Sequence, residues 1–293
     1  MPGPDRDAAA PEAPLADRIE AALGRRPLAL VPLSGGSTVR VLRADLPGGE
    51  RIVAKAGRGQ LALERRMLDA LARYSDLPLP TVLHGADDLL LMTHVDHDGG
   101  APGAAAQAHA AELLAALHAT PRERFGYECD TVIGQLPQPN PPGDRWIPFF
   151  RDHRLLHMAE RGHAEGTVSD RLRGRLEALA ARLDDYLDEP AHSAMLHGDV
   201  WTGNVLSRGD RVAAFIDPAI YHGHPEIELA FATLFGTFGK PFFRRYGEIR
   251  PLAPGFFELR CDLYNIYPLL VHVRYWDTSY ARPIEATLDR LGL

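Results

Sequence analysis

The sequence predicts an α+β fold with two lobes, a small strand-rich lobe over residues 15–94 and a larger, mainly helical lobe over 95–293. Three observations lead to this prediction. Short alternating or apolar runs, broken by glycine turns, fill the first third of the chain. Amphipathic helical patterns fill most of the rest, and a polar loop and hairpin that include Asp199 and Asp217 interrupt them within residues 195–218. A length of 293 residues also fits two domains of roughly 150 residues each.

The small lobe is expected to begin with one helix and to continue as strands. Residues 1–14 are rich in proline and alanine, which predicts a disordered tail. A short helix is expected over 15–23. The stretch 31–55 indicates three strands joined by a Gly-Gly turn and a Pro-Gly-Gly turn, and the stretch 81–95 indicates a further hairpin.

The Gly-Gly turn is a candidate phosphate contact. Glycine lets backbone N–H groups approach an anion closely, which would suit Gly35, Gly36 and Ser37 for binding a nucleotide. Such glycine pairs also occur in plain hairpin turns, so the turn alone does not decide its role.

A lysine and a glutamate follow this turn at a spacing that suits phosphate binding. Lys55 ends the third strand, and Glu64 lies in the first turns of the helix expected over 60–74. We predict that the two side chains form an ion pair that orients Lys55 toward the phosphates of a nucleotide. Arg65 and Arg66 are alternative, surface partners for Glu64.

Several helices are expected in the large lobe. Residues 104–119 are alanine-rich with leucines at helical spacing, and 169–187 form an amphipathic pattern with Ser169 as its N-cap. A buried helix is expected over 225–238, and a final helix over 255–275. The stretch 121–143 contains five prolines and is expected to be a loop.

The acidic loop of the large lobe carries the predicted chemistry. Asp199 follows an apolar strand, Asn204 lies five residues later, and Asp217 ends a second apolar strand. An acid, an amide and an acid in this order are typical of the catalytic loop of kinases. Mg²⁺ prefers oxygen ligands, so Asn204 and Asp217 are the predicted metal ligands. Asp199 is the predicted base for a hydroxyl proton. Two surface turns capped by acids are the alternative interpretation.

The sequence around this loop resembles the fructosamine kinase (ketosamine 3-kinase) family. The resemblance extends from about Leu15 to Tyr280 and is densest around the catalytic loop. Its marks are Trp201, two residues after the predicted base, the run Asp217-Pro218-Ala219, Tyr221, Gly223 and the run Glu228-Leu229-Ala230.

The resemblance implies a two-lobed protein-kinase-like fold and an ATP-dependent kinase that uses Mg²⁺. The implied acceptor is the sugar 3-hydroxyl of a ketoamine, the adduct that forms when glucose or ribose glycates an amine. Thr93, His94 and Val95 would join the lobes, and their backbone would bind the adenine edge. Glu228 would brace the backbone of the catalytic loop.

The same resemblance makes four residues candidates for the acceptor pocket: Trp201, Trp146, Arg151 and Tyr221. Trp146 also suits the start of a helix packed in the large lobe, and Trp201 also suits a wedge that holds the loop. The expected partner is a small-molecule ketoamine or a glycated protein side chain. The sequence does not distinguish these two, nor fructose from ribose.

Two alternative functions remain open. One is another small-molecule kinase of the same fold, of the aminoglycoside, choline or homoserine type; Trp201 and the pattern of residues 149–156 argue against it. The other is a catalytically silent nucleotide-binding module, against which the filled catalytic positions argue.

Composition narrows the expected partners and compartment. A net charge of −7 leaves no overall basic footprint for nucleic acid. No apolar run reaches the roughly 18 residues of a membrane span, and the N-terminus lacks a signal-peptide pattern. Two cysteines, Cys129 and Cys261, do not make a disulfide framework. We therefore expect a cytoplasmic protein that binds neither nucleic acid nor membrane.

Overall fold

The computed structural model describes residues 12–33 and 39–293. Most of the predicted N-terminal tail and the turn residues Gly35, Gly36 and Ser37 lie outside the described residues.

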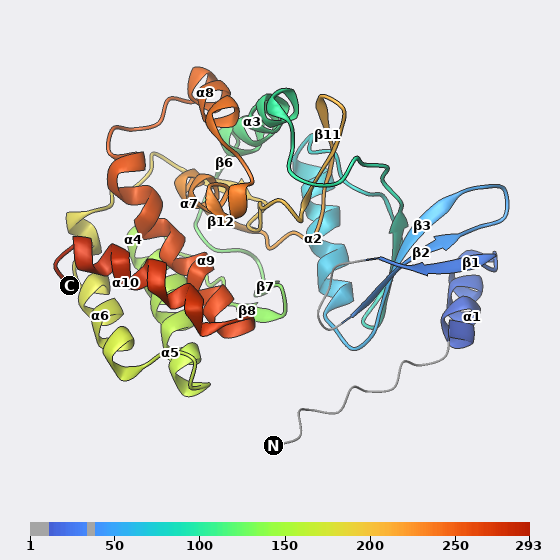
Figure 1. The fold of residues 1–293 in the computed structure, drawn as a ribbon, viewed down its shortest axis with the longest axis horizontal. Helices are drawn as coiled ribbons and strands as arrows, with labels where there is room; N and C mark the ends of the chain where they lie inside the picture. Colours follow the sequence, from blue (N-terminus) through green and yellow to red (C-terminus); the bar gives the residue numbers. More distant parts are fainter. Residues whose placement is uncertain (1–11, 34–38) are drawn as a thin grey trace. The chain divides into compact units, whose positions relative to one another are not determined.

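The chain divides into two compact units. The N-terminal unit contains the chain up to Asp69 together with Pro80–Val95, and the C-terminal unit contains Ala70–Leu79 together with Asp96–Leu293. The first is rich in strands and the second is mainly helical, as predicted (Figure 1). Residues 70–79 belong to the second unit although they precede the last two strands of the first.

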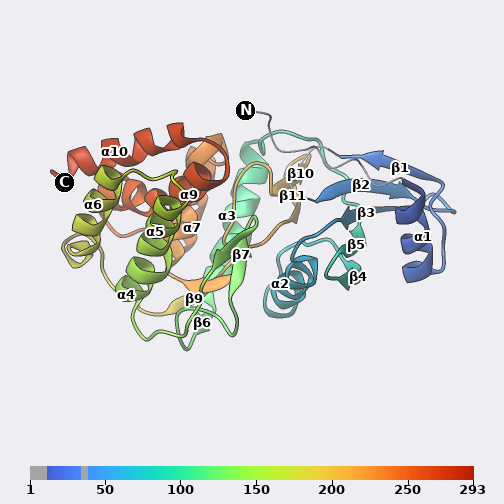
Figure 2. The same cartoon turned by 90° about the horizontal axis from the view of Figure 1, so that it is seen from below.

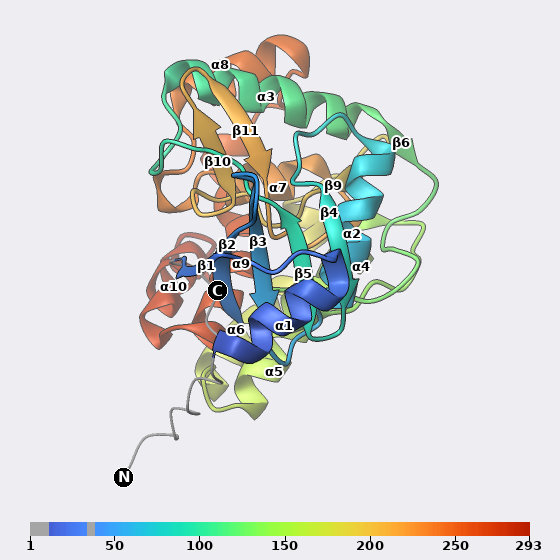
Figure 3. The same cartoon turned by 90° about the vertical axis from the view of Figure 1, so that its right-hand side faces the viewer.

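An antiparallel five-stranded sheet forms the centre of the N-terminal unit, in the order β1-β2-β3-β5-β4. Its strands are β1 (Ala29–Pro32), β2 (Arg40–Asp45), β3 (Arg51–Ala56), β4 (Val82–Ala86) and β5 (Leu89–Thr93). Helix α1 (Glu12–Leu23) begins three residues before the predicted start and packs Leu15 and Ile19 on the sheet (Figure 3).

Strand alternation in β3 decides which way Lys55 points. Ala54 and Ala56 belong to the apolar cluster under α1, and successive side chains of a strand point to opposite faces. Lys55 therefore faces away from that cluster. On its side lies Glu64, in the first turn of α2 (Leu61–Tyr74).

The helices of the C-terminal unit pack around a mainly apolar core. Figure 2 shows α5 beside α6 and α9, and α10 beside α9. The α-helices after α2 are α3 (Ala104–Ala119), α4 (Trp146–Phe150), α5 (His157–Ala164), α6 (Asp170–Ala180), α7 (Pro225–Phe231), α8 (Lys240–Ile249), α9 (Cys261–Tyr275) and α10 (Ala281–Arg290). Shorter 3₁₀ and π turns are η1 (Arg151–Leu156), η2 (Leu183–Asp185), η3 (Leu234–Gly236), η4 (Phe256–Arg260) and η5 (Thr278–Tyr280).

Short strands of the C-terminal unit position the acidic loop. A three-stranded sheet has the order β12-β9-β6, and two hairpins are formed by β10 with β11 and by β7 with β8. These strands are β6 (Pro121–Arg122), β7 (Thr131–Ile133), β8 (Leu136–Gln138), β9 (Ser193–Leu196), β10 (Val205–Arg208), β11 (Arg211–Phe215) and β12 (Tyr221–Gly223). The stretch 121–143, predicted as a loop, therefore contains three strands.

Two predicted helices are shorter than expected. The helix predicted over 225–238 ends at Phe231, and Phe235 and Gly236 then take left-handed φ values of 57° and 67°, which an α-helix cannot include. The helix predicted over 169–187 ends at Ala180. Its predicted cap is confirmed, because Ser169 Oγ accepts a hydrogen bond from the Leu172 N–H at 3.2 Å.

The chain also ends in a helix that the sequence analysis missed. The helix predicted over 255–275 is not the last one, since α10 follows it with Ile284, Thr287 and Leu288 buried. Within the described residues, no helix combines the length and the apolar character needed to cross a membrane.

Candidate active site

The loop after β9 brings Asn204 back to Asp199. The Asn204 N–H donates to the Trp201 carbonyl at 2.8 Å, which closes a turn. The side-chain amide Nδ2 of Asn204 then donates to both Asp199 O, at 2.9 Å, and Asp199 Oδ2, at 2.8 Å. The five-residue spacing thus has a direct geometric reason. The carbonyl oxygen Oδ1 of Asn204 is left as the atom that can bind a cation.

Asp217 lies at the end of the β10–β11 hairpin, next to Asn204. The Ile216 N–H donates to the Asn204 carbonyl at 3.0 Å, which ties the end of β11 to the loop. Asp217 is exposed and has a φ of 52°, in the left-handed region that aspartate and asparagine tolerate better than most residues. Such strained backbone is frequent at functional sites.

The electrostatics of the loop suit a proton acceptor. Burial raises the pKa of Asp199 to about 8, and the negative charges of Asp217 and Glu228 act in the same direction, whereas the hydrogen bond from Asn204 opposes them. A base with a pKa near neutral pH is well matched to proton transfer. The predicted trio of Asp199, Asn204 and Asp217 therefore lies in one place, and its charges interact.

Glycine is required before Asp199. Gly198 has a φ of 86°, and a Cβ on it would lie 2.1 Å from the Ala219 carbonyl oxygen. The Ala219 N–H donates to His197 O at 2.8 Å, so the two segments cross in close contact. The Gly198 N–H donates to Glu228 Oε1 at 2.6 Å, which confirms the expected brace of the catalytic loop.

A second buried brace holds the segment after Asp217. Gln138 at the end of β8 donates through Nε2 to Ala219 O at 3.0 Å and to Thr131 Oγ1 at 2.8 Å. The Tyr267 hydroxyl donates to Gln138 Oε1 at 2.6 Å. The polar groups of Gln138 are therefore used within the protein, and this residue stabilises the chain beside Gly198.

In the N-terminal unit, Lys55 and Glu64 form the predicted ion pair. Lys55 Nζ lies 2.7 Å from Glu64 Oε1, and the lysine is buried. Arg65, one of the alternative partners of Glu64, pairs with Asp69 at 3.3 Å. A role of Lys55 in binding phosphates stays a prediction.

Two backbone N–H groups of the predicted adenine-binding segment donate hydrogen bonds within the N-terminal unit. The Thr93 N–H donates to Thr81 O at 2.9 Å, and the His94 N–H donates to Arg51 O at 3.2 Å. These two backbone N–H groups therefore already have acceptors within the N-terminal unit. A role for His94 and Val95 stays a prediction.

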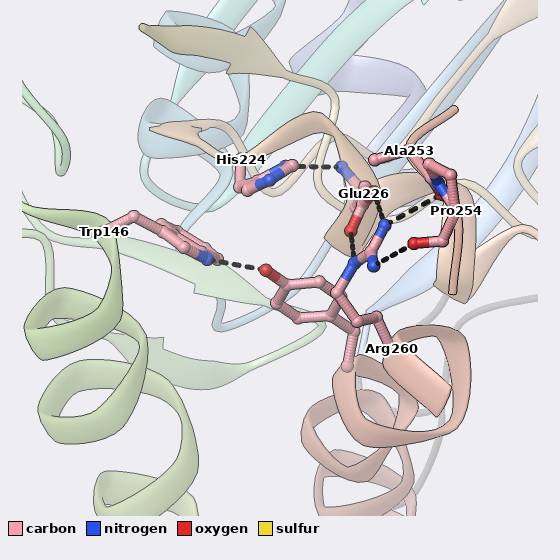
Figure 4. A network of polar contacts seen from close by, with 7 residues as sticks. Trp146, His224, Glu226, Ala253, Pro254 and Arg260 are labelled. Atoms are coloured by element: carbon pink, nitrogen blue, oxygen red, sulfur yellow. Dashed lines mark hydrogen bonds and ion pairs between the residues drawn. The ribbon is translucent and has the colours of Figure 1, made fainter. Parts of the chain in front are cut away.

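The four acceptor candidates differ in exposure. Trp146 is 0% exposed and donates its Nε1–H to the Tyr264 hydroxyl at 3.0 Å (Figure 4). Tyr221 is 2% exposed and lies under the buried Arg154 guanidinium, 4.0 Å from the ring centroid. A side chain without exposed surface cannot contact an acceptor in this conformation. The structure thus corrects the expectation for Trp146 and Tyr221, which are core residues.

Figure 4 also shows the polar network around Trp146. Glu226 accepts two hydrogen bonds from Arg260, at 2.6 and 2.7 Å, and the Arg260 guanidinium also donates to the carbonyls of Ala253 and Pro254. His224 caps α7 by accepting from the Glu226 N–H at 3.0 Å. This network explains why the polar residues near Trp146 are buried, and it serves packing.

Arg151 and Trp201 keep exposed surface. Arg151 forms two hydrogen bonds with Asp152, at 2.8 and 2.9 Å, and its role in acceptor binding stays a prediction. Trp201 is 37% exposed, and its ring lies edge-on to Phe235 with centroids 6.1 Å apart.

Phe235 extends this exposed aromatic surface. It is 42% exposed and its ring centroid lies 4.7 Å from that of His272 and 6.2 Å from that of Tyr280. We call Trp201, Phe235, His272 and Tyr280 the aromatic cluster. The sequence analysis missed Phe235 because it placed this residue inside a buried helix; Gly236 beside it was the available signal for a break.

Comparison with known proteins identifies the family. The family model of fructosamine kinases matches residues 55–292. The chain belongs to the fructosamine kinase family. A probable ketoamine kinase from Synechocystis sp. is 36% identical over 182 residues, which cover 60% of this chain and 59% of that protein. The chain spans 59% and 61% of the length of two curated relatives it matches, or about three fifths.

Two solved structures have a fold similar to that of this chain. A candidate fructosamine-3-kinase from Thermobifida fusca is 31% identical with a TM-score of 0.82, and the match covers 94% of this chain and 96% of that chain. An aminoglycoside phosphotransferase solved with ADP and hygromycin B shares the fold at 17% identity, with a TM-score of 0.66 and a match over 94% and 98% of the two chains. The fold of this fructosamine kinase family member is thus that of the kinase-like phosphotransferases.

Proposed function

We propose that this member of the fructosamine kinase family transfers the γ-phosphoryl group of ATP to the 3-hydroxyl of a sugar-derived ketoamine. The observation that carries the proposal is Asp199, hydrogen-bonded by Asn204 and close enough to Asp217 for its charge to raise the pKa of Asp199. Membership of the family supports the choice of acceptor.

Asp199 takes the proton of the acceptor hydroxyl. Its Oδ2 already accepts a hydrogen bond from Asn204, so Oδ1 is the oxygen that receives the proton. As the hydroxyl oxygen bonds to the γ-phosphorus, the bond from that phosphorus to the β–γ bridging oxygen breaks, and ADP leaves. Most of the rate acceleration in such a reaction comes from positioning and electrostatic stabilisation.

Asn204 and Asp217 are the residues that would hold Mg²⁺. The Asn204 amide nitrogen donates to Asp199, which leaves its carbonyl oxygen for a cation, and Asp217 offers an exposed carboxylate. These are the hard oxygen donors that Mg²⁺ prefers, and the repulsion between Asp199 and Asp217 favours a cation beside them. When bound, Mg²⁺ neutralises the charge of the phosphate oxygens.

The nucleotide contacts belong to the same proposal. Lys55, held by Glu64, would bind the α- and β-phosphates, and Gly35, Gly36 and Ser37 would approach them with backbone N–H groups. The backbone of Thr93, His94 and Val95 would border the adenine.

An ADP-release assay on four acceptors tests the proposed function. Fructosyl-lysine and ribulosyl-lysine are the expected substrates, and kanamycin and choline represent the alternative kinases. We expect turnover with a ketoamine and a phosphate on the sugar 3-oxygen by ³¹P–¹H correlation. Turnover with kanamycin or choline alone would overturn the acceptor assignment. ATP binding without turnover on any acceptor would favour a silent nucleotide-binding module.

Trp201 is the strongest acceptor candidate that keeps exposed surface. An indole packs against the apolar face of a sugar and excludes water, and Trp201 is two residues from Asp199. Trp201→Leu keeps apolar bulk in the loop. We expect kcat/KM for the ketoamine to fall at least tenfold, about 1.4 kcal/mol, with unchanged ATP affinity and melting temperature.

Trp276→Leu is the matched control for this variant. Trp276 is 65% exposed in the same unit and does not belong to the aromatic cluster. Its replacement should leave kcat/KM within about twofold of the wild type, as expected for an exposed site outside the loop. A Trp201 variant that loses several degrees of melting temperature with unchanged kinetics would assign Trp201 to packing of the loop instead.

A further inference from the structure

A buried chain of three hydrogen bonds joins the catalytic loop to three helices, α7, α3 and α8. Tyr246 Oη of α8 lies 2.9 Å from His118 Nδ1 of α3, and His118 Nε2 lies 2.8 Å from Glu228 Oε2 of α7. Glu228 Oε1 accepts from the Gly198 N–H at 2.6 Å. His118, Glu228 and Tyr246 are 0%, 2% and 2% exposed. Figure 1 shows α3 and α8 side by side, in agreement with their contacts.

The donors and acceptors of this chain are all matched in the His118 tautomer that carries its proton on Nε2. The Gly198 N–H can only donate, so Glu228 Oε1 accepts. Glu228 Oε2 then accepts from the Nε2–H of His118. His118 Nδ1 then carries a lone pair, and the Tyr246 hydroxyl donates to it. Every polar group is satisfied, which matters because an unpaired buried carboxylate oxygen costs free energy.

Glu228 therefore binds the Gly198 N–H with one carboxylate oxygen, and His118 binds the other. The backbone at Gly198 has little freedom, since the Ala219 carbonyl lies against it and its φ is 86°. Asp199 follows directly. Small displacements of a catalytic group lower phosphoryl-transfer rates steeply, because that chemistry depends on alignment.

We propose that His118 is a positioning residue for phosphoryl transfer. It acts through Glu228 on the Gly198 N–H and so sets the place of Asp199, while Tyr246 holds the His118 ring at Nδ1. The role of His118 in the rate rests on the proposed function. The effect of His118 on the Gly198 N–H, through Glu228, can be tested without that function.

The kinetic test compares two replacements of His118. His118→Leu removes the donor to Glu228, and we expect kcat for the ketoamine to fall at least about tenfold while both KM values stay within about threefold. His118→Gln places an amide N–H where Nε2 was, and we expect it to recover kcat to within about threefold of the wild type. In a Glu228→Ala background, His118→Leu should reduce kcat no further, because the two residues act as one unit.

Leu114→Ala is the matched control for lost packing. Leu114 lies one turn earlier on α3, is 0% exposed and has no part in the hydrogen-bond chain. It should lower the melting temperature by creating a cavity while leaving kcat within about twofold. Equal kcat losses in the Leu114 and His118→Leu variants, or no rescue by His118→Gln, would overturn the positioning role.

Hydrogen exchange at the Gly198 amide is the readout that needs no activity. We expect His118→Leu to speed exchange of this amide by about tenfold or more relative to Leu114→Ala, and His118→Gln to restore its protection. If Gly198 protection is unchanged in His118→Leu, the proposed action of His118 on Gly198 is wrong, even if kcat falls. A wild-type protein that phosphorylates no acceptor but shows this exchange pattern would contradict the proposed function and leave the His118 contact supported.

Discussion

Replacing Asp199 by asparagine is expected to lower kcat by roughly 10²–10⁴-fold, the range for loss of a general base. The amide has the shape of the carboxylate, and its carbonyl oxygen can still accept the hydrogen bond that Asn204 now donates to Oδ2. The loop should therefore keep its conformation, and the affinity for ATP should stay within about threefold. Steady-state kinetics and calorimetric titration of ATP measure the two quantities.

The pH dependence gives this variant a second readout. A protonated Asp199 cannot take a proton, so the wild-type rate should fall as pH drops through its pKa, which a bound cation would hold below the value of about 8 set by burial and Asp217. The residual activity of Asp199→Asn should lack this acidic limb. Turnover near the wild-type level, with the limb retained, would remove Asp199 from the role of base.

Replacing Asp217 by asparagine is expected to lower kcat by on the order of 10²–10³-fold, the usual loss when one transition-state contact is removed. Asparagine suits the left-handed φ of 52° at this position, whereas alanine would add backbone strain. The change therefore removes a charge and keeps the backbone. We also expect the Mg·ATP complex to bind at least about tenfold more weakly, while the small affinity for ATP in EDTA stays unchanged.

Asp210→Asn is the matched control for Asp217→Asn. Asp210 is exposed and lies in the turn of the same β10–β11 hairpin. It loses one negative charge from the same element without touching the loop at Asp199, and its kinetics should match the wild type. Equal Mg·ATP affinity in the Asp217 variant and the wild type, with the fold intact, would assign the metal to other ligands.

Local patterns predicted the features that depend on short stretches of chain. Asn204 returns to Asp199 through a turn that closes within the loop, so a spacing of five residues was enough to pair them. Lys55 and Glu64 are nine residues apart on a strand and the following helix, and strand alternation with helix periodicity brings them together at 2.7 Å. The N-cap of Ser169 is local in the same way.

Exposure of aromatic residues could not be predicted in this way. Trp146 and Trp201 both lie near proline or glycine in the sequence, yet one is 0% and the other 37% exposed. An apolar side chain is attracted equally by a core and by a binding surface, and the choice depends on which elements pack around it. The same holds for Phe235. Its left-handed φ after the end of α7 breaks the predicted helix, and its ring then lies beside that of Trp201.

The sequence by itself determined the residue types and order of the catalytic loop, the Lys55–Glu64 pair and the strand-rich and helical halves, because these depend on spacing along the chain. The family resemblance implied the Glu228 brace of this loop, and only the tertiary structure decided what holds Glu228. His118 is 110 residues from Glu228 and 128 from Tyr246, and three helices must pack before these side chains can meet. A single histidine at the end of an alanine-rich helix carries no local signal of such partners, since hydrogen bonds between distant elements exist only after the core has formed.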